Sequence, residues 1–382
     1  MRVEKPDGLQ GLISARVLWV LSLHSRLARF LPPYLAQHLR LNFCLALIPT
    51  LLVAIISAGC AGAKSQRPAH LMTHVPVAHS GSALTEIIEA GYLCTNCYAD
   101  NHGQIEPILE ANGYKAMYFA PHCLNPWYDH NPLHYWRIFY RYPKVVAIYN
   151  TNWNYVTLVF IGTEKFGDFI MDSETSGYED NPKTDYFYIP PGHAGFRGGI
   201  LNLISQHYFT NCLLKFCMTN NVPRCDGKYK VRLVGHSLGA GLAQMAIGVT
   251  DGLRYDHTLA IQPDKTWPFS FRNAVLFAPP YALSRTNKNP DCSYATGVSL
   301  EQFVERYQTN VLNIIRDDDM VPRLYNPLNR HGLQYVPLRH FGRIRRIDQT
   351  GTLESETWTA DPNAPDNTFP HQIDSYLDAI DK

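Results

Sequence analysis

One segment near the middle of the chain restricts the fold more than any other. Residues 229–234 are rich in apolar and β-branched residues, which predicts a buried strand, and Gly-His-Ser-Leu-Gly follows directly at positions 235–239. Residues 240–243 then predict a helix whose small side chains pack closely on a sheet. The turn between them is formed by Gly235, His236 and Gly239 around Ser237, and it is too tight for side chains at the two glycines. The segment therefore predicts a strand, a sharp turn that carries Ser237, and a helix.

A serine in this position is suited to act as a nucleophile. The start of the following helix directs free N–H groups at it, and the N–H of Leu238 is the first donor for an oxyanion. A hydroxyl is a poor nucleophile until a base takes its proton, so an acid and a histidine must assist. In this arrangement they follow the serine in the order acid, then histidine. This chemistry needs no metal and no cofactor.

Strands and helices alternate over the second half of the chain. The strongest strand patterns lie at residues 145–149, 155–161, 229–234, 273–277, 310–315 and 335–347. Helical patterns lie at residues 83–91, 196–210, 238–249, 300–307 and 371–380. This alternation predicts an α/β fold with a mainly parallel central sheet, helices on both faces, and one domain at 83–382.

The acid has three candidates at the end of one predicted strand. Asp317, Asp318 and Asp319 follow the apolar run at residues 310–315, and strand ends are where such sheets present catalytic groups. Asp319 lies nearest the Val-Pro turn and is our choice, although residue type alone weights the three nearly evenly. A cation-binding acidic cluster is the alternative interpretation.

Three histidines follow the aspartates and are candidates for the base. They are His331, His340 and His371. His340 lies within the predicted strand at 335–347, where a side chain is more often packed along the sheet. His371 lies where a loop meets the last predicted helix, so it can reach the nucleophile; an exposed histidine at a helix start is the alternative.

Four segments, taken in order, resemble the class 3 lipases, the fungal-lipase and diacylglycerol-lipase-like branch of the α/β-hydrolases. The resemblance covers roughly residues 145–382. The segments are Leu-Val-Phe-Ile-Gly-Thr at 158–163 with Asp-Phe-Ile-Met-Asp at 168–172, His-Ala-Gly-Phe at 193–196, Gly-His-Ser-Leu-Gly at 235–239, and Asp-Met-Val-Pro-Arg-Leu at 319–324 with His371 and Tyr376. Their order and spacing are more specific than any single motif.

The resemblance implies roles that residue types leave open. It implies Asp319 as the acid, His371 as the base, and Thr163 as the second oxyanion donor beside Leu238. It also implies that residues 164–172 form a lid over the site, whose apolar side chains would face lipid when the lid is open. These side chains are Phe166, Phe169, Ile170 and Met171. Ordinary core packing explains the same apolar residues equally well.

The family pattern is not matched everywhere. The usual arginine before Gly-Thr is Ile161 here, the second glycine of the helix after the turn is Ala240, and the tryptophan of the lid motif is Phe169. None of these differences removes a catalytic group. They bear on how the lid behaves.

The N-terminal region has the pattern of a leader. No acidic residue occurs between Asp7 and Glu86, and several arginines precede an apolar run at 41–58. The run ends in small residues around Cys60, which resembles the lipidated cysteine of a bacterial lipoprotein signal. We expect a leader at residues 1–60 and a tether at 61–82. A signal anchor, an organellar transit peptide or a buried helix would use the same residues.

Charge and cysteine content exclude some functions and leave others open. Lys and Arg total 34 against 33 Asp and Glu, so no charge excess favours nucleic acid. We expect a lipid ester as substrate, with a lipid interface or membrane surface as partner, and an exported or membrane-attached protein. Seven cysteines beyond Cys60 would allow three disulfides in an exported chain. Cys94 and Cys97 have the spacing of a redox or zinc site, but no second pair completes one.

Three further functions remain compatible with the sequence, and one of them is a redox or metal protein that uses Cys94 and Cys97. An esterase for small esters, a phospholipase or an acyltransferase would use the same catalytic residues. A membrane-tethered binding protein could keep the fold without catalysis.

Overall fold

The computed structural model describes the body of the chain with gaps. The described residues are 83–97, 109–119, 144–162, 187–205, 207–255, 261–284, 297–317, 319, 321–323, 338–347, 353 and 373–380. All of them belong to one compact unit, Ile56–Lys382. The expected leader and tether, including Cys60, lie outside the described residues.

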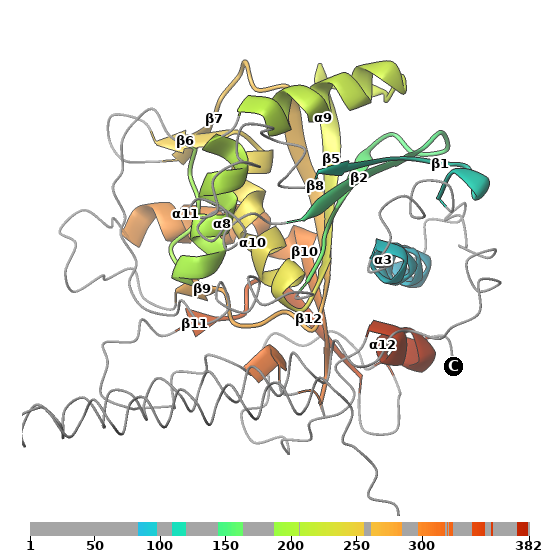
Figure 1. The fold of residues 1–382 in the computed structure, drawn as a ribbon. Coiled ribbons are helices and arrows are strands. Elements are labelled where there is room, and N and C mark those ends of the chain that lie inside the picture. The colour runs from blue at the N-terminus through green and yellow to red at the C-terminus, as the bar shows by residue number, and fades with distance from the viewer. Residues whose placement is uncertain are drawn as a thin grey trace, which may run out of the picture. The chain divides into compact units, whose positions relative to one another are not determined.

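A mainly parallel sheet forms the centre of this unit (Figure 1). Its strands run in the order β1-β2-β3-β5-β8-β10-β12, with β4 paired to β5. β1 and β2 are antiparallel to their neighbours, whereas β3, β5, β8, β10 and β12 are parallel. The strand bounds are Tyr114–Phe119 (β1), Val145–Asn150 (β2), Val156–Phe160 (β3), Arg224–Cys225 (β4), Lys228–His236 (β5), Phe269–Phe277 (β8), Val311–Arg316 (β10) and Arg343–Ile347 (β12). The predicted α/β fold with a mainly parallel sheet is confirmed.

Helices cover both faces of the sheet. α8 (Ala194–Ser205), α10 (Leu238–Thr250) and α11 (Gly297–Tyr307) lie on one side, and α3 (Ala83–Cys97) and α12 (Ile373–Ile380) lie on the other (Figure 1). Every residue of α10 is buried, as expected for a helix of small and apolar residues against a sheet. α9 (His207–Thr219) packs on α8.

Two predicted elements are divided in the structure. The helical pattern at 196–210 belongs to two helices, α8 and α9. The strand pattern at 335–347 contains two short strands: β11 (Leu338–Arg339) pairs with β9 (Leu283–Ser284), and β12 pairs with β10. The break falls at Gly342, whose φ of 104° a side chain rarely permits, and a Cβ there would lie 2.6 Å from the Val311 carbonyl oxygen. One continuous strand over 335–347 was therefore a wrong prediction.

The remaining short elements lie around the sheet and do not alter its order. β6 (Leu253–Tyr255) and β7 (Ile261–Pro263) form an antiparallel pair. Two 3₁₀ turns, η4 (Gln308–Asn310) and η5 (Val321–Arg323), flank β10. Among the described helices, none is long and apolar enough to span a membrane.

The cysteines of the described ranges are free thiols. They are Cys94, Cys97, Cys212, Cys217 and Cys225. Because five of the seven cysteines beyond Cys60 are free, the three disulfides that an exported chain would allow cannot all form; Cys123 and Cys292 lie outside the described residues. Cys94 and Cys97 are buried within α3, and burial raises the pKa of the Cys94 thiol well above its usual value. A protonated, buried thiol is a poor redox or metal-binding group.

Candidate active site

Ser237 lies at the junction of β5 and α10 in a strained backbone conformation. Its φ of 58° and ψ of −131° are uncommon for a residue with a side chain. The Ser237 N–H donates to the carbonyl oxygen of Phe277, the last residue of β8, at 3.0 Å. This bond ties the turn to the neighbouring strand, so the strain is held by the sheet.

The two glycines of the turn are required for space. A Cβ on Gly235 would lie 2.5 Å from the Gly239 carbonyl oxygen, and one on Gly239 would lie 2.1 Å from the Phe160 carbonyl oxygen. Both contacts are with backbone atoms, which cannot rotate away. The glycines therefore allow α10 to begin directly against β5 and β3.

Two residues beside the serine have defined positions. Leu238 is the first residue of α10, so its N–H belongs to the helix turn that has no intrahelical acceptor. His236 is the last residue of β5 and is buried, with its ring 6.2 Å from that of Tyr376. The start of α10 thus presents N–H groups and a positive dipole end beside Ser237.

Asp319 follows β10 and is almost fully buried, with 1% of its surface exposed. One carboxylate oxygen accepts the Val321 N–H at 2.8 Å, and the other accepts the Tyr376 hydroxyl at 2.7 Å. Asp317, by contrast, is half-buried, and its backbone N–H bonds to Ile347. The carboxylate of Asp319 therefore has a fixed orientation. Asp318 lies outside the described residues.

Sheet topology places Ser237 and Asp319 at the same edge. They follow β5 and β10, which are parallel and separated only by β8. The carboxyl ends of parallel strands share one edge of a sheet, where such folds place their functional groups. Tyr376 also connects the two regions, because it contacts His236 through its ring and Asp319 through its hydroxyl.

Tyr376 is a site residue whose role the sequence did not disclose. It lies in α12 with no exposed surface, and the Arg316 N–H donates to its hydroxyl at 3.2 Å. Burial, followed by the negative charge of Asp319, raises the pKa of Tyr376 well above its usual value. The hydroxyl therefore stays protonated and remains a donor to Asp319. The resemblance to the class 3 lipases included Tyr376 in its last segment but gave it no role.

Several predicted site residues lie outside the described residues. These are Thr163, Phe166, Phe169, Ile170, Met171 and His371. His371 precedes α12 by two positions in the sequence. His331 also lies outside, so its alternative role as the base stays a prediction.

The described histidines have structural surroundings. His193 is buried directly before α8, where its Nδ1 accepts the Phe196 N–H at 3.4 Å and its ring stacks on that of Phe196. His340 lies between β11 and β12 with its ring 4.2 Å from that of Tyr281. Within the described ranges, no group of three or more His, Cys, Asp or Glu residues could hold a metal ion.

The parallel sheet, the helices on both faces and the serine turn between β5 and α10 together define an α/β-hydrolase fold. No protein-family model matches the chain, and no curated protein sequence matches it.

Solved structures of fungal lipases are similar to this chain. The lipase of Rhizopus microsporus var. chinensis is 16% identical, with 69% of this chain and 74% of the lipase covered and a TM-score of 0.41. Lipase II of Rhizopus niveus is 17% identical, with 69% and 80% covered and a TM-score of 0.42. A Rhizomucor miehei lipase propeptide complex is 12% identical, with 78% and 75% covered and a TM-score of 0.43.

Proposed function

We propose that this protein is a serine hydrolase that cleaves carboxylic esters of lipids. The observation that carries the proposal is the strained turn at Ser237, which is held between β5, β8 and α10 at the edge of the sheet where Asp319 is also buried. Strained backbone of this kind persists only where the surrounding structure enforces it. Such strained conformations cluster at active sites, where they hold a reactive side chain in position.

The proposed reaction proceeds through an acyl-enzyme. Ser237 attacks the ester carbonyl while His371 accepts its proton, and the N–H groups of Leu238 and Thr163 stabilise the oxyanion. His371 then donates the proton to the leaving alcohol, and water releases the acyl group by the reverse sequence. Asp319 orients His371 and stabilises its charged form. The bonds from Val321 and Tyr376 hold the carboxylate in place for this task.

The lipid substrate is the less direct part of the proposal. It rests on the motif resemblance and on the apolar segment at 164–172, which we propose to be a lid that opens at a lipid interface. The leader at 1–60, with Cys60 as a lipid attachment site, would place the protein in or near a membrane or outside the cell. A small-ester esterase, a phospholipase and an acyltransferase differ only in the group that enters or leaves.

Labelling with a fluorophosphonate probe tests the nucleophile. We expect the full-length wild type to be labelled, Ser237→Ala to lose labelling and ester hydrolysis, and Ser270→Ala to keep both. Ser270 is a matched control because it is a buried serine on β8. Labelling that survives in Ser237→Ala would refute the assignment. A folded wild type that is neither labelled nor active would favour the binding protein.

A substrate panel separates the remaining chemistries. We expect the wild type to release fatty acid from emulsified glycerides faster than from phospholipids or from short soluble esters. Transfer of the acyl group to added glycerol in preference to water would identify an acyltransferase. Activity confined to soluble esters would contradict the lipid substrate while leaving the serine mechanism intact.

A further inference from the structure

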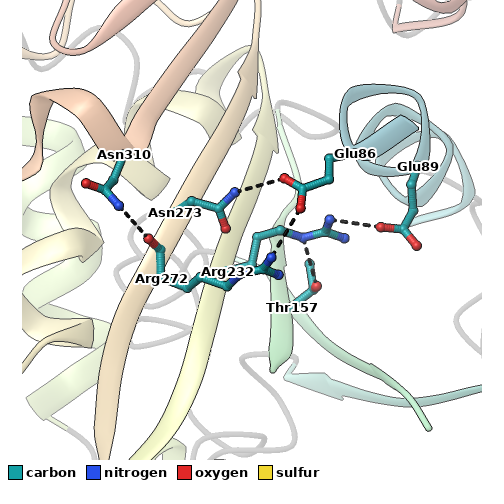
Figure 2. A network of polar contacts seen from close by, with 7 residues as sticks. All are labelled: Glu86, Glu89, Thr157, Arg232, Arg272, Asn273 and Asn310. Carbon is teal, nitrogen blue, oxygen red and sulfur yellow. Dashed lines mark hydrogen bonds and ion pairs between the residues drawn. The ribbon is translucent and has the colours of Figure 1, made fainter. Parts of the chain in front are cut away.

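Helix α3 is attached to the sheet by two ion pairs that join segments far apart in the sequence. The Glu89 carboxylate lies 2.9 Å from the Arg232 guanidinium on β5, and neither side chain has any exposed surface. Glu86, three positions earlier, pairs with Arg272 on β8 at 3.1 Å (Figure 2). Because residues three apart lie on one helix face, both pairs hold the same side of α3 against the sheet.

The Arg232 side chain is itself held in one place. Its Nε donates to the Thr157 hydroxyl on β3 at 3.1 Å (Figure 2), and its guanidinium lies 5.1 Å from the ring centroids of Trp153 and Tyr155. A displacement of Glu89 would leave a buried guanidinium without its counter-charge, which is strongly unfavourable. The position of α3 on the sheet is therefore narrowly defined.

The same helix is in close contact with α12 at Gly91. A Cβ on Gly91 would lie 2.4 Å from Cδ2 of Leu377, 3.1 Å from Cγ of Leu377 and 3.3 Å from Cζ of Phe277. Gly91 has ordinary helical backbone, so the glycine is required by space and not by conformation. Leu377 is 2% exposed and has no room to turn into solvent. A side chain at position 91 must therefore displace the buried Leu377 side chain or Phe277.

Both neighbours of Gly91 are linked to the groups that hold Asp319 and Ser237. Leu377 is adjacent to Tyr376, whose hydroxyl donates to Asp319 at 2.7 Å. Phe277 supplies the carbonyl oxygen that accepts the Ser237 N–H. The rings of Phe277 and Tyr376 also contact each other edge to face, with centroids 6.3 Å apart.

We infer that Gly91 is a positioning residue: through Leu377 and Phe277, α3 sets the place of the Tyr376 hydroxyl, and hence of the Asp319 carboxylate, for ester hydrolysis. The catalytic part of this inference rests on the proposed function. The geometric part, that α3 positions α12, does not. The atoms nearest a Cβ at position 91 belong to Leu377 and Phe277, so the effect of Gly91 on Asp319 and Ser237 is indirect.

A set of four variants of the full-length protein tests the inference. Gly91→Ala adds the obstructing methyl group, Leu377→Ala removes its neighbour, and the double variant does both. Gly198→Ala is the matched control, because Gly198 lies in helix α8 and a Cβ there meets nothing within 4 Å. Each variant is assayed for kcat and KM on a short soluble ester. Hydrogen exchange of the peptide that contains α12 is measured alongside.

We expect Gly91→Ala to lower kcat by about tenfold or more with little change in KM, because small displacements of a catalytic group are costly while substrate binding is untouched. The double variant should regain most of that loss. Exchange in α12 should increase in Gly91→Ala but not in Gly198→Ala. Leu377→Ala alone should increase exchange in α12 and lower kcat to a smaller extent.

Two results would overturn the inference. The first is a Gly91→Ala protein with the kcat and α12 exchange of Gly198→Ala. The second is a kcat loss that Leu377→Ala does not rescue although the double variant is folded. If Gly91→Ala does not fold, Leu377→Ala decides alone, and wild-type kcat and exchange in it would refute the inference. A wild type without esterase activity would instead refute the proposed function, while the exchange data would still test the geometry.

Discussion

The hydrogen bond between Tyr376 and Asp319 should support both the stability and the activity of the protein. Tyr376→Phe removes the hydroxyl and keeps the ring. The bond is 2.7 Å long and joins a neutral donor to a carboxylate, with 0% and 1% of the two residues exposed, so water does not readily replace it. Hydrogen bonds to charged groups contribute about 1.5 to 3 kcal/mol, and we expect a loss of that size in unfolding free energy. Urea denaturation measures it.

The same variant should lower kcat by about tenfold with KM nearly unchanged, because the carboxylate loses one of two bonds that fix its orientation. Tyr114→Phe is the matched control. Tyr114 is equally buried, and its hydroxyl has no hydrogen-bond partner among the described residues. Removal of this hydroxyl should leave the unfolding free energy unchanged or raise it by up to about 1 kcal/mol. If Tyr376→Phe matches Tyr114→Phe in unfolding free energy and in kcat, the role given to Tyr376 is refuted.

Three further predictions concern the frame around the site. Glu89→Gln should lower the unfolding free energy by about 3 to 5 kcal/mol, because the substitution leaves the buried Arg232 charge unpaired. Chemical denaturation measures this loss, and an unchanged denaturation midpoint would contradict the prediction. Gly239→Ala should abolish probe labelling and destabilise the fold by about 1 to 3 kcal/mol, because the added Cβ meets the Phe160 carbonyl; normal labelling would be the contrary result. The unfolding free energy should fall above about pH 10, because burial raises the pKa of Tyr376 and the unfolded chain then releases a proton that the folded chain retains. Denaturation at about pH 8 and at about pH 11 tests this. The fall in unfolding free energy should be smaller in Tyr376→Phe.

The sequence predicted the parts of the fold that depend on local pattern. The turn around Ser237 combines a strand, two glycines and a small-residue helix within 16 consecutive positions from Lys228 to Ala243, so its geometry could be expected without knowing the rest. The alternation of strands and helices predicted the parallel sheet for the same reason. The strand at 335–347 was wrongly predicted to be continuous, because the apolar pattern persists across Gly342, whose φ of 104° interrupts the extended backbone.

The frame behind the sheet could not be predicted in this way. Arg232 lies within strand β5, which also carries Lys228 and Lys230, and its partner Glu89 is 143 positions away on α3. Nothing local distinguishes this arginine from an exposed one, since alternating strands often carry charged residues on a solvent face. The contact of Gly91 with Leu377 joins the first and last described helices and is equally invisible in a local pattern. Long-range packing, and not propensity, decides both.

The two proposed catalytic groups therefore depend on one support rather than on two independent ones. The Ser237 N–H is held by Phe277 and the Asp319 carboxylate by Tyr376, and the rings of Phe277 and Tyr376 contact each other on the side of the sheet that α3 and α12 cover. A movement of α3 would reach both groups at once, although it touches neither. Substitutions at the two ends of this chain of contacts should consequently be non-additive, in contrast to distant, independent sites. The test is a double variant of Gly91→Ala with Tyr376→Phe. If its loss in kcat equals the product of the two single losses, the two substitutions act independently and the shared support is refuted.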